Sequence, residues 1–237
     1  MESKPPKSQF YLFNRFFLKN GSQLGRLHEF CEKGFLPALE RHCAGPKIFL
    51  QATMAGHMPQ VAMLAGLSSW DAYGVLREKL GGDRDFASLS AKWEVDDEQP
   101  VEHYTTSLLR ATAYSPEISN AEPPAKPRIF EFRSYHSPSH WKLYALHQRF
   151  AGPEIGIFHR LGIRPILYTD TEIGPGKPCL VYLTPFESLA EREEKWAAFA
   201  ADPEWQELKK ESAKDNGPLA SIVSIEIFTA APYSPVR

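Results

Sequence analysis

The fold is decided by one stretch of the sequence, Pro185-Phe-Glu-Ser-Leu-Ala-Glu-Arg-Glu-Glu-Lys-Trp-Ala-Ala-Phe-Ala-Ala-Asp-Pro-Glu-Trp205. Within it, Ser188 and Glu191 form a Ser-x-x-Glu capping box, in which the hydroxyl and the carboxylate each satisfy a free backbone amide at a helix start. Leu189 and Trp196 then recur on one side of that helix, while the charged residues fall elsewhere. The stretch therefore predicts an amphipathic helix that packs its apolar side on a core.

A second helical start follows directly. Asp202 is a strong N-cap residue, and Pro203 fits the first position of a helix. Trp205 and Leu208 lie three residues apart and supply a short apolar side. We expect one helical region over residues 188–212 that restarts at Asp202.

The composition is that of an ordinary folded protein of one or two domains. The chain has 237 residues, of which 43% are hydrophobic, enough for normal cores. Lys and Arg (27) nearly balance Asp and Glu (29), and the net charge of −2 argues against a nucleic-acid partner. The three cysteines, Cys31, Cys43 and Cys179, form no Cys-x-x-Cys pair and predict neither a disulfide framework nor a zinc site.

The compartment expected from the sequence is the cytoplasm. No apolar run approaches the roughly 18 residues of a membrane span, and the N-terminus has no apolar signal core. Reduced, buried cysteines fit the same compartment. If a longer leader has been removed before Met1, the protein would instead be exported.

The sequence contains an internal repeat with an offset of 119 residues. The matching positions need no gap and run through most of both halves. They include Phe13 with Phe132, His28 with His147, Ser69 with Ser188, Asp83 with Asp202, and Tyr114-Ser-Pro116 with Tyr233-Ser-Pro235. We predict two domains, residues 9–115 and 128–235, joined by a Pro-rich linker at residues 116–127.

Each copy has the same predicted order of elements. In the second copy we expect strands at residues 129–135, 163–171, 180–184 and 222–229. Helices are expected at residues 140–161, with a break near Gly152-Pro153, and at 188–212. The order βαββαβ is that of a ferredoxin-like unit, which is α+β and has one bare sheet face. Two units can pack their antiparallel sheets face to face, which predicts a single-chain, barrel-like equivalent of a symmetric dimer.

The second half resembles the NIPSNAP family of the dimeric α/β-barrel superfamily. The resemblance rests on Glu131-Phe-Arg-Ser-Tyr135, on Pro178-Cys-Leu-Val-Tyr-Leu183 and on Trp196-Ala-Ala-Phe-Ala-Ala-Asp-Pro-Glu-Trp205. The first half is similar as a diverged copy, with Leu12-Phe-Asn-Arg-Phe16 in place of the first motif. The resemblance implies a single-chain dimeric α/β barrel. It implies little chemistry, because the family is largely without an assigned reaction, while its superfamily includes cofactor-free monooxygenases, haem proteins and lactone isomerases.

Strand alternation supplies a candidate site, because successive side chains point to opposite faces of a sheet. We expect an apolar face to cover the helices, formed by Phe130, Phe132, Val181, Leu183, Ile225 and Ile227. The other face would then point into the barrel with Glu131, Arg133, Tyr135, Tyr182 and Glu226. Arg133 would lie between Glu226 and Tyr182 and could orient a small polar ligand by bidentate hydrogen bonds. The alternative is a buried ion network that fixes strand pairing.

The equivalent positions of the first half are mostly apolar or small: Leu12, Asn14, Phe16, Met63 and Ser107. Asn14 is the polar counterpart of Arg133, and we include it among the predicted ligand-binding residues. A barrel with one polar and one apolar wall would suit an amphipathic ligand. It would equally describe a hydrophobic core with a polar patch.

Other common functional signatures are missing from the sequence. His28 and His147 share one repeat position, which predicts either packing or a common role near the pseudo-twofold axis. The histidines show no metal-ligand spacing, so no metal and no cofactor is predicted, although a single haem-ligating histidine would leave no such pattern. No phosphate-binding glycine loop and no nucleophile elbow are found.

Two functions remain open. In the first, a non-catalytic barrel binds a small molecule or a protein partner, as a single-chain pseudo-dimer that could associate further. In the second, the protein is a cofactor-independent enzyme of the monooxygenase or isomerase type that uses Tyr135, Tyr182 or His147 for proton transfer. The lack of a catalytic motif favours the first.

The duplication generates a prediction about truncated chains. Separating the halves within residues 116–127 should leave each with a bare apolar sheet face larger than a monomer usually exposes. We expect each half to dimerise or aggregate, as measured by size-exclusion chromatography with light scattering. Two soluble, folded, monomeric halves would contradict the packing of sheet on sheet.

Overall fold

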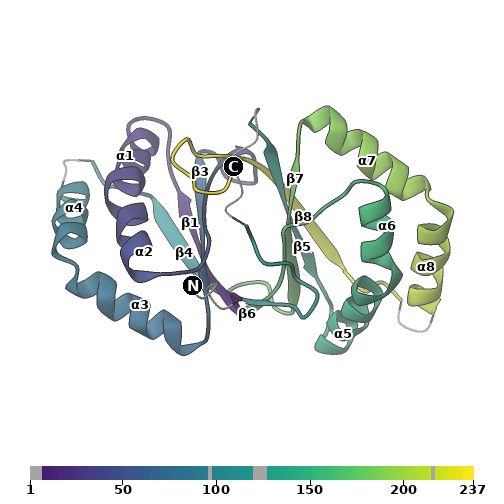
Figure 1. The fold of residues 1–237 in the computed structure, drawn as a ribbon. Helices are drawn as coiled ribbons and strands as arrows, with labels where there is room; N and C mark the ends of the chain where they lie inside the picture. The colour runs from purple at the N-terminus through teal and green to yellow at the C-terminus, as the bar shows by residue number, and fades with distance from the viewer. Residues whose placement is uncertain (1–6, 96–97, 120–126, 215–216) are drawn as a thin grey trace, which may run out of the picture.

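The strands of both halves close into one barrel in the computed structural model, which describes residues 7–95, 98–119, 127–214 and 217–237. The first half contains β1 Phe10–Phe17, α1 Gln23–Phe30, η1 Cys31–Phe35, α2 Leu36–His42, β2 Lys47–Met54, β3 Gln60–Leu67, α3 Asp71–Gly82, α4 Arg84–Glu94 and β4 His103–Ala111. The second half contains β5 Ile129–His136, α5 His140–Arg149, η2 Phe150–Glu154, α6 Ile155–Arg160, β6 Leu167–Ile173, β7 Cys179–Phe186, α7 Leu189–Ala201, α8 Pro203–Lys214 and β8 Ile222–Ala230. The strands lie at the centre, and each half places its helices on its own outer side (Figure 1).

The order of elements predicted for the second half is confirmed, and the boundary that differs most is the start of β6. β6 begins at Leu167 and not at residue 163. Pro165 lies in the segment that was expected to be strand, and it has no N–H to donate to a neighbouring strand. The chain therefore enters the sheet only after the proline.

The caps predicted for the two long helices are present. Ser188 accepts a hydrogen bond from the backbone N–H of Glu191 (3.1 Å), and Asp202 accepts one from that of Trp205 (3.0 Å). The Glu191 carboxylate accepts from the amide of Glu187, one residue earlier than the capping box would place it. Each bond satisfies an amide that has no partner inside its helix.

The predicted break near Gly152-Pro153 is a π-helical turn, η2. Pro153 lacks the N–H of a regular helix, and Gly152 leaves the helical conformation (φ −86°, ψ −132°). The first half has the turn η1 at the equivalent place, 119 residues earlier, without a proline. The two halves therefore share this irregularity as part of the repeat.

Within each half the strands follow the ferredoxin-like order, and the two sheets also join at their edges. The closed order is β1-β3-β2-β8-β5-β7-β6-β4. It contains β4-β1-β3-β2 from the first half and β8-β5-β7-β6 from the second. The predicted fold class is confirmed. The antiparallel pairs β2–β8 and β4–β6 add two seams, which give partners to edge strands that would otherwise be exposed.

Both seams are short, and this leaves one end of the barrel open. In the described residues, β8 pairs with β2 from Ile227 to Ala230, and β4 pairs with β6 from Leu108 to Ala111. The earlier residues, 222–226 and 103–107, pair on one side only, with β5 and β1. The strands therefore separate toward the ends at which residues 103 and 222 lie.

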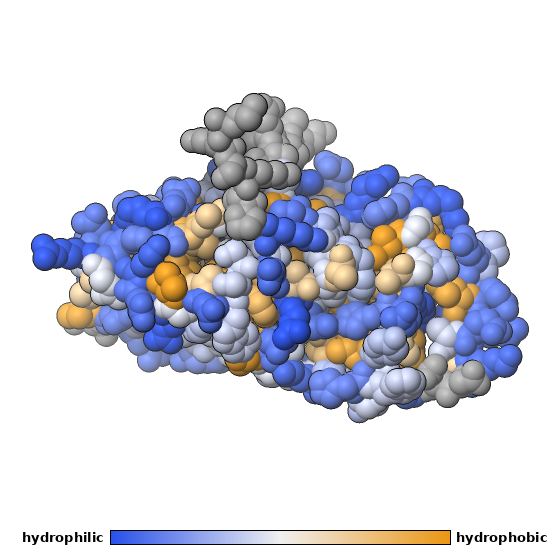
Figure 2. All heavy atoms as spheres, turned by 60° about the horizontal axis from the view of Figure 1, so that its bottom comes forward, coloured by the Kyte–Doolittle hydropathy of each residue, from blue (hydrophilic) through white to orange (hydrophobic). Residues whose placement is uncertain are grey.

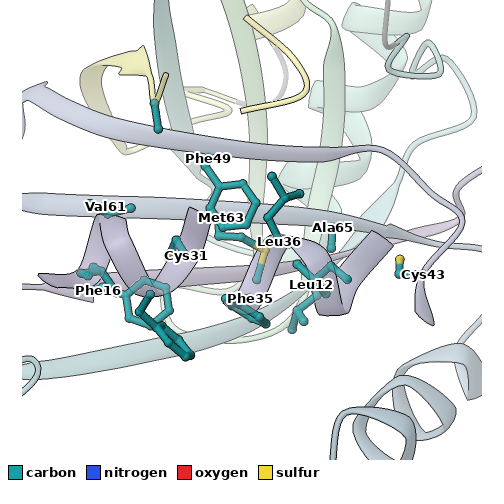
Figure 3. Packing of buried hydrophobic residues seen from close by; sticks show 14 of the residues in the cluster. Leu12, Phe16, Cys31, Phe35, Leu36, Cys43, Phe49, Val61, Met63 and Ala65 are labelled. Carbon is teal, nitrogen blue, oxygen red and sulfur yellow. The ribbon is translucent and has the colours of Figure 1, made fainter. Parts of the chain in front are cut away.

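Three apolar clusters hold the fold together. The first lies between the sheet and helices of the first half, where Phe35 and Leu36 pack on Leu12, Phe49 and Met63 (Figure 3). The second is the equivalent layer of the second half, around Phe150, Phe158 and Tyr182. The third fills the barrel and draws on both halves, including Phe13, Leu64, Phe130, Phe132, Leu183 and Phe228. Full burial of each large side chain contributes about 1.5–3 kcal/mol.

The repeated Tyr-Ser-Pro segments fasten each half to the other. The Ser115 hydroxyl accepts a hydrogen bond from the backbone N–H of Tyr168 at 3.0 Å, in the opposite half. Ser234 does the same for the backbone N–H of Phe49, also at 3.0 Å. These contacts are equivalent under the 119-residue offset and extend the two seams.

The repeated histidines bind the tyrosines of the same segments. His147 Nδ1 and the Tyr114 hydroxyl are hydrogen-bonded at 2.7 Å, and His28 Nδ1 and the Tyr233 hydroxyl at 2.9 Å. Each pair again joins one half to the other. Burial lowers the pKa of His28, so this ring is neutral at pH 7. The two histidines therefore share one structural contact, with a tyrosine of the opposite half, and a place near the pseudo-twofold axis stays a prediction.

Several other features bear on the sequence predictions. The three cysteines are free and buried. No helix in the described ranges combines the length and the apolar character needed to cross a membrane. On the face shown in Figure 2, hydrophilic surface divides the hydrophobic residues into separate patches. Most of the predicted linker, residues 120–126, lies outside the described residues, so the domain limits stay a prediction.

The serine contacts at the seams can be tested by mutation. Ser115→Ala and Ser234→Ala should each lower the free energy of unfolding by about 1–3 kcal/mol, because a buried N–H loses its acceptor. Ser68→Ala, at an exposed serine, is the control and should change it by less than about 0.5 kcal/mol. Urea denaturation measures all three, and equal stabilities would show that the hydroxyls do not hold the seams.

Candidate functional site in the open end of the barrel

A cavity of about 520 Å³ occupies the open end of the barrel. Side chains of both halves line it. They include Phe13, Arg15 and Phe17 of β1, Thr105 and Ser107 of β4, Ser134 and His136 of β5, Thr171 of β6, Cys179 and Val181 of β7, and Ser224 and Glu226 of β8. The cavity lies where the two seams have ended, so strand separation explains its position.

The floor of the cavity is apolar. Phe13 and Phe132 are equivalent residues of the two halves, and their rings stack with centroids 5.1 Å apart. Phe228 meets Phe132 edge to face at 5.9 Å. Beyond these rings the barrel is filled, and Ile118 and Val236 are buried in the same cluster. A ligand therefore has access from one end only, as far as the described residues go.

One ion pair crosses between the halves in this cavity. Arg15 Nη2 donates to Glu226 Oε1 at 2.6 Å, and Arg15 Nε donates to Gln60 Oε1 at 3.0 Å. The two charged side chains are 26% and 18% exposed, so the pair is weakly screened. The guanidinium also lies 5.4 Å from the ring centroid of Phe17. These contacts fix Arg15 against one wall.

The opposite wall carries short hydroxyl side chains. Ser107 is buried and Ser134 is half-buried, and neither hydroxyl has a hydrogen-bond partner among the described residues. Under the 119-residue offset these serines are the counterparts of Glu226 and Arg15. The first wall therefore holds a charge pair where the second holds two serines, and the smaller side chains leave room.

The rim contains one histidine held by a loop. His136 Nδ1 donates to the carbonyl oxygen of Gly176 at 2.8 Å. Gly176 has φ +76°, and a Cβ atom there would lie 2.5 Å from Cε1 of the imidazole. Glycine is therefore needed at this position for both the turn and the close approach of the ring.

The predicted orientation of the β5–β7 face was wrong. Phe130, Phe132, Val181 and Leu183, expected to cover the helices, lie in the barrel interior. Tyr135 and Tyr182, expected inside, belong to the helix-side cluster, and Glu131 and Arg133 contact residues of α7. Glu226 alone of the five predicted residues of the second half lines the cavity.

Arg133 and Glu226 are separated because of the register in which β8 pairs with β5. Phe132 is opposite Glu226, and Arg133 is opposite Ile225. Residues directly opposite each other share a face, so Arg133 and Glu226 lie on different faces. A shift of one residue in an assumed register exchanges the two faces of a strand, which separates the predicted pair.

Glu131 and Arg133 form a buried ion network with α7. Glu131 is fully buried and accepts hydrogen bonds from Arg133 and from Arg192. The Arg133 guanidinium lies 3.7 Å from the ring centroid of Trp196. Each charge of the network thus has a partner of opposite sign, as a buried group requires.

The two predicted tyrosines extend this network, and Asn14 lies apart from it. Tyr182 donates to the hydroxyl oxygen of Tyr135 at 2.8 Å, and Arg133 donates to the same oxygen at 3.3 Å. Asn14 accepts a hydrogen bond from Thr106 at 2.9 Å on β1 of the first half. Ligand binding by Glu131, Arg133, Tyr135, Tyr182 and Asn14 stays a prediction.

The residues suggested for proton transfer do not line the cavity. Tyr182 is fully buried on the helix side, and burial together with the neighbouring Tyr135 holds its pKa well above the usual range. His147 is engaged at the seam with Tyr114 and lies 3.0 Å from Asp170. In the cavity, burial raises the pKa of the Cys179 thiol to about 12, so this sulfur is not a ready nucleophile at pH 7.

The described part of the chain brings together no group of three or more His, Cys, Asp or Glu residues that could hold a metal ion. The residue missed from the sequence was Arg15. Its alternation with Phe13 and Phe17 is visible in the sequence, but its partner Glu226 lies 211 residues away and on another strand pair. Knowledge of how the two sheets join would have been needed to find the pair.

Comparison with known proteins supports the fold and one family. Residues 130–235 match the model of the NIPSNAP family. A NIPSNAP-like domain protein from Burkholderia xenovorans is 30% identical, with 46% of this chain and 89% of that chain covered and a TM-score of 0.41. The search for similar curated proteins found no match.

Two solved structures resemble the whole chain. A provisionally named monooxygenase from Fusobacterium nucleatum has 7% identity and a TM-score of 0.61, with 94% of this chain and 93% of that chain covered. Another from Lactobacillus acidophilus has 8% identity and a TM-score of 0.56, with 94% of each chain covered. At such identities the likeness shows the fold alone.

The buried network offers a matched pair of mutations. Glu131→Gln should destabilise the protein by about 3–5 kcal/mol, because two buried guanidinium groups lose their shared counter-charge. Glu193→Gln removes another carboxylate from the same Arg192, but Glu193 is 71% exposed, so the cost should be at most about 1 kcal/mol. Chemical denaturation compares the two, and similar small effects would contradict a structural role for Glu131.

Proposed function

We propose, from the premise that residues 130–235 form a NIPSNAP domain, that this barrel is a binding protein for a small amphipathic molecule held in its open end. The observation that carries the proposal is the cavity of about 520 Å³, a size within the usual range for small-molecule sites. Its floor is aromatic and its walls carry a few polar groups. An apolar body could rest on Phe13 and Val181 while a polar head reaches Arg15, Glu226 or the serines.

The difference between the two halves supports the same proposal. A symmetric barrel would place the same side chains on both walls. Here Arg15 and Glu226 occupy one wall, and their counterparts Ser134 and Ser107 occupy the other. A ligand would therefore enter in one orientation, with its polar head directed by the charged wall.

A catalytic role of the monooxygenase or isomerase type is the alternative. It needs an acid or base beside the ligand. Tyr135, Tyr182 and His147 are absent from the residues that line the cavity. Of the lining residues, His136 and Glu226 have suitable side chains, and Glu226 is already paired with Arg15. The geometry favours binding, and binding of a protein partner remains a further alternative for the outer surface.

A cavity-filling mutation tests the proposal. Ser134→Phe should occupy the space beside the serine wall and abolish any rise in melting temperature that small amphipathic molecules cause in the wild type. Ser88→Phe, at an exposed serine of α4, is the matched control and should keep the rise. A thermal-shift screen of such molecules provides the readout.

Two outcomes of this screen would contradict a ligand site in the barrel: no stabilising compound at all, or shifts that are equal in wild type, Ser134→Phe and Ser88→Phe. Arg133→Lys in the same assay tests the prediction for the helix-side residues. Loss of the shift in that variant, with little loss of stability, would place the ligand beside the planar guanidinium of Arg133.

A further inference from the structure

The Arg15–Glu226 pair is incomplete as an ion pair. One contact joins the two side chains, from Nη2 to Oε1 at 2.6 Å, and Nε is used by Gln60. The remaining nitrogen, Nη1, and the remaining oxygen, Oε2, have no hydrogen-bond partner among the described residues. A bidentate arginine–carboxylate pair would have used both groups on each side. This pair lines the cavity and keeps one donor and one acceptor without a partner among the described residues.

The charge of the wall favours a neutral partner. Arg15 and Glu226 cancel, and the other side chains that line the cavity carry no permanent charge. A bound carboxylate would meet Arg15 but would also be placed beside the Glu226 carboxylate, and a bound ammonium would be placed beside Arg15. In a site this weakly screened, either like-charge contact opposes binding. A neutral group avoids both.

We infer that the ligand carries a neutral head group with a hydrogen-bond acceptor and donor side by side, of the primary-amide type, and that this head group bridges Arg15 and Glu226. The inference rests on the proposed ligand-binding function. The carbonyl oxygen accepts from the free Nη1 of Arg15, and the N–H donates to the free Oε2 of Glu226. The apolar body of the ligand lies on the Phe13 floor, and the hydroxyls of Ser107 and Ser134 bind any second polar group.

Three probes with one body and different charges test the inference: 2-naphthamide, 2-naphthoate and 2-naphthylmethylamine at pH 7. Binding to the full chain is measured by ¹⁵N NMR titration, which reports whether the signals of Ser107 and Ser134 shift. We expect the neutral amide to bind at least tenfold more tightly than either the anion or the cation. Equal or tighter binding of a charged probe in the cavity would overturn the inference and leave the ligand-binding proposal intact.

Substitution of the wall should reverse the charge preference. Glu226→Gln removes the negative charge that would repel an anion and leaves Arg15 without its counter-charge, so we expect naphthoate to become the tightest of the three probes. In Arg15→Gln, which also serves if the first variant does not fold, the naphthylmethylammonium ion should become the tightest. An unchanged order of affinities in the folded variants would show that the pair does not contact the head group.

Glu172→Gln is the matched control. Glu172 also forms an ion pair with an arginine, Arg110, at 2.9 Å, but neither of these two residues lines the cavity. This variant should leave all three affinities within a factor of two of the wild type. If no probe shifts the signals of Ser107 and Ser134 in the wild type, the ligand-binding proposal fails together with the inference.

Discussion

Closure of the barrel depends on the pairing of edge strands from opposite halves. The first half alone would leave its edge strands β2 and β4 with unpaired backbone groups, and the second half alone would leave β6 and β8 in the same state. The seams β2–β8 and β4–β6 satisfy these groups, and Ser115 and Ser234 extend them by accepting one further backbone N–H each. Because both segments reach across to the other half, neither sheet is completed without its partner. The interior enclosed in this way belongs to both halves.

Once the barrel is closed, its interior and the helix layers impose different requirements on the strands. The filled end of the interior offers few polar partners for a charged side chain. The strand β5 therefore directs Phe130 and Phe132 inward. The helix layer supplies Arg192 and Trp196 of α7, which can satisfy Glu131 and Arg133. Charged strand residues can therefore lie beneath a helix when that helix brings the counter-charge. On β5 the charged residues lie on the helix-covered face, contrary to the usual assumption that this face is the apolar one.

The sequence predicted most of the fold and a small part of the site, for different physical reasons. The repeat, the helix caps at Ser188 and Asp202 and the element order depend on local patterns, and the structure has them. The site depends on register and on long-range pairing. The alternation along β5 identified two faces, but which face points inward is set by the closure of the barrel, and Glu226 lies opposite Phe132 because of a register that no local signal specifies. Arg15 was missed for the same reason.

Duplication within one chain has a consequence that a symmetric dimer cannot have. In a dimer of identical chains, an arginine at the position of Arg15 would occur twice, once on each wall, and a glutamate at that of Glu226 would also occur twice. The two pairs would fill the open end of a small barrel with charge. After duplication, one copy of each position can change independently, and here the equivalent positions hold Ser134 and Ser107. The divergence of the two halves thus accounts both for the space in the barrel and for the difference in polarity between its two walls.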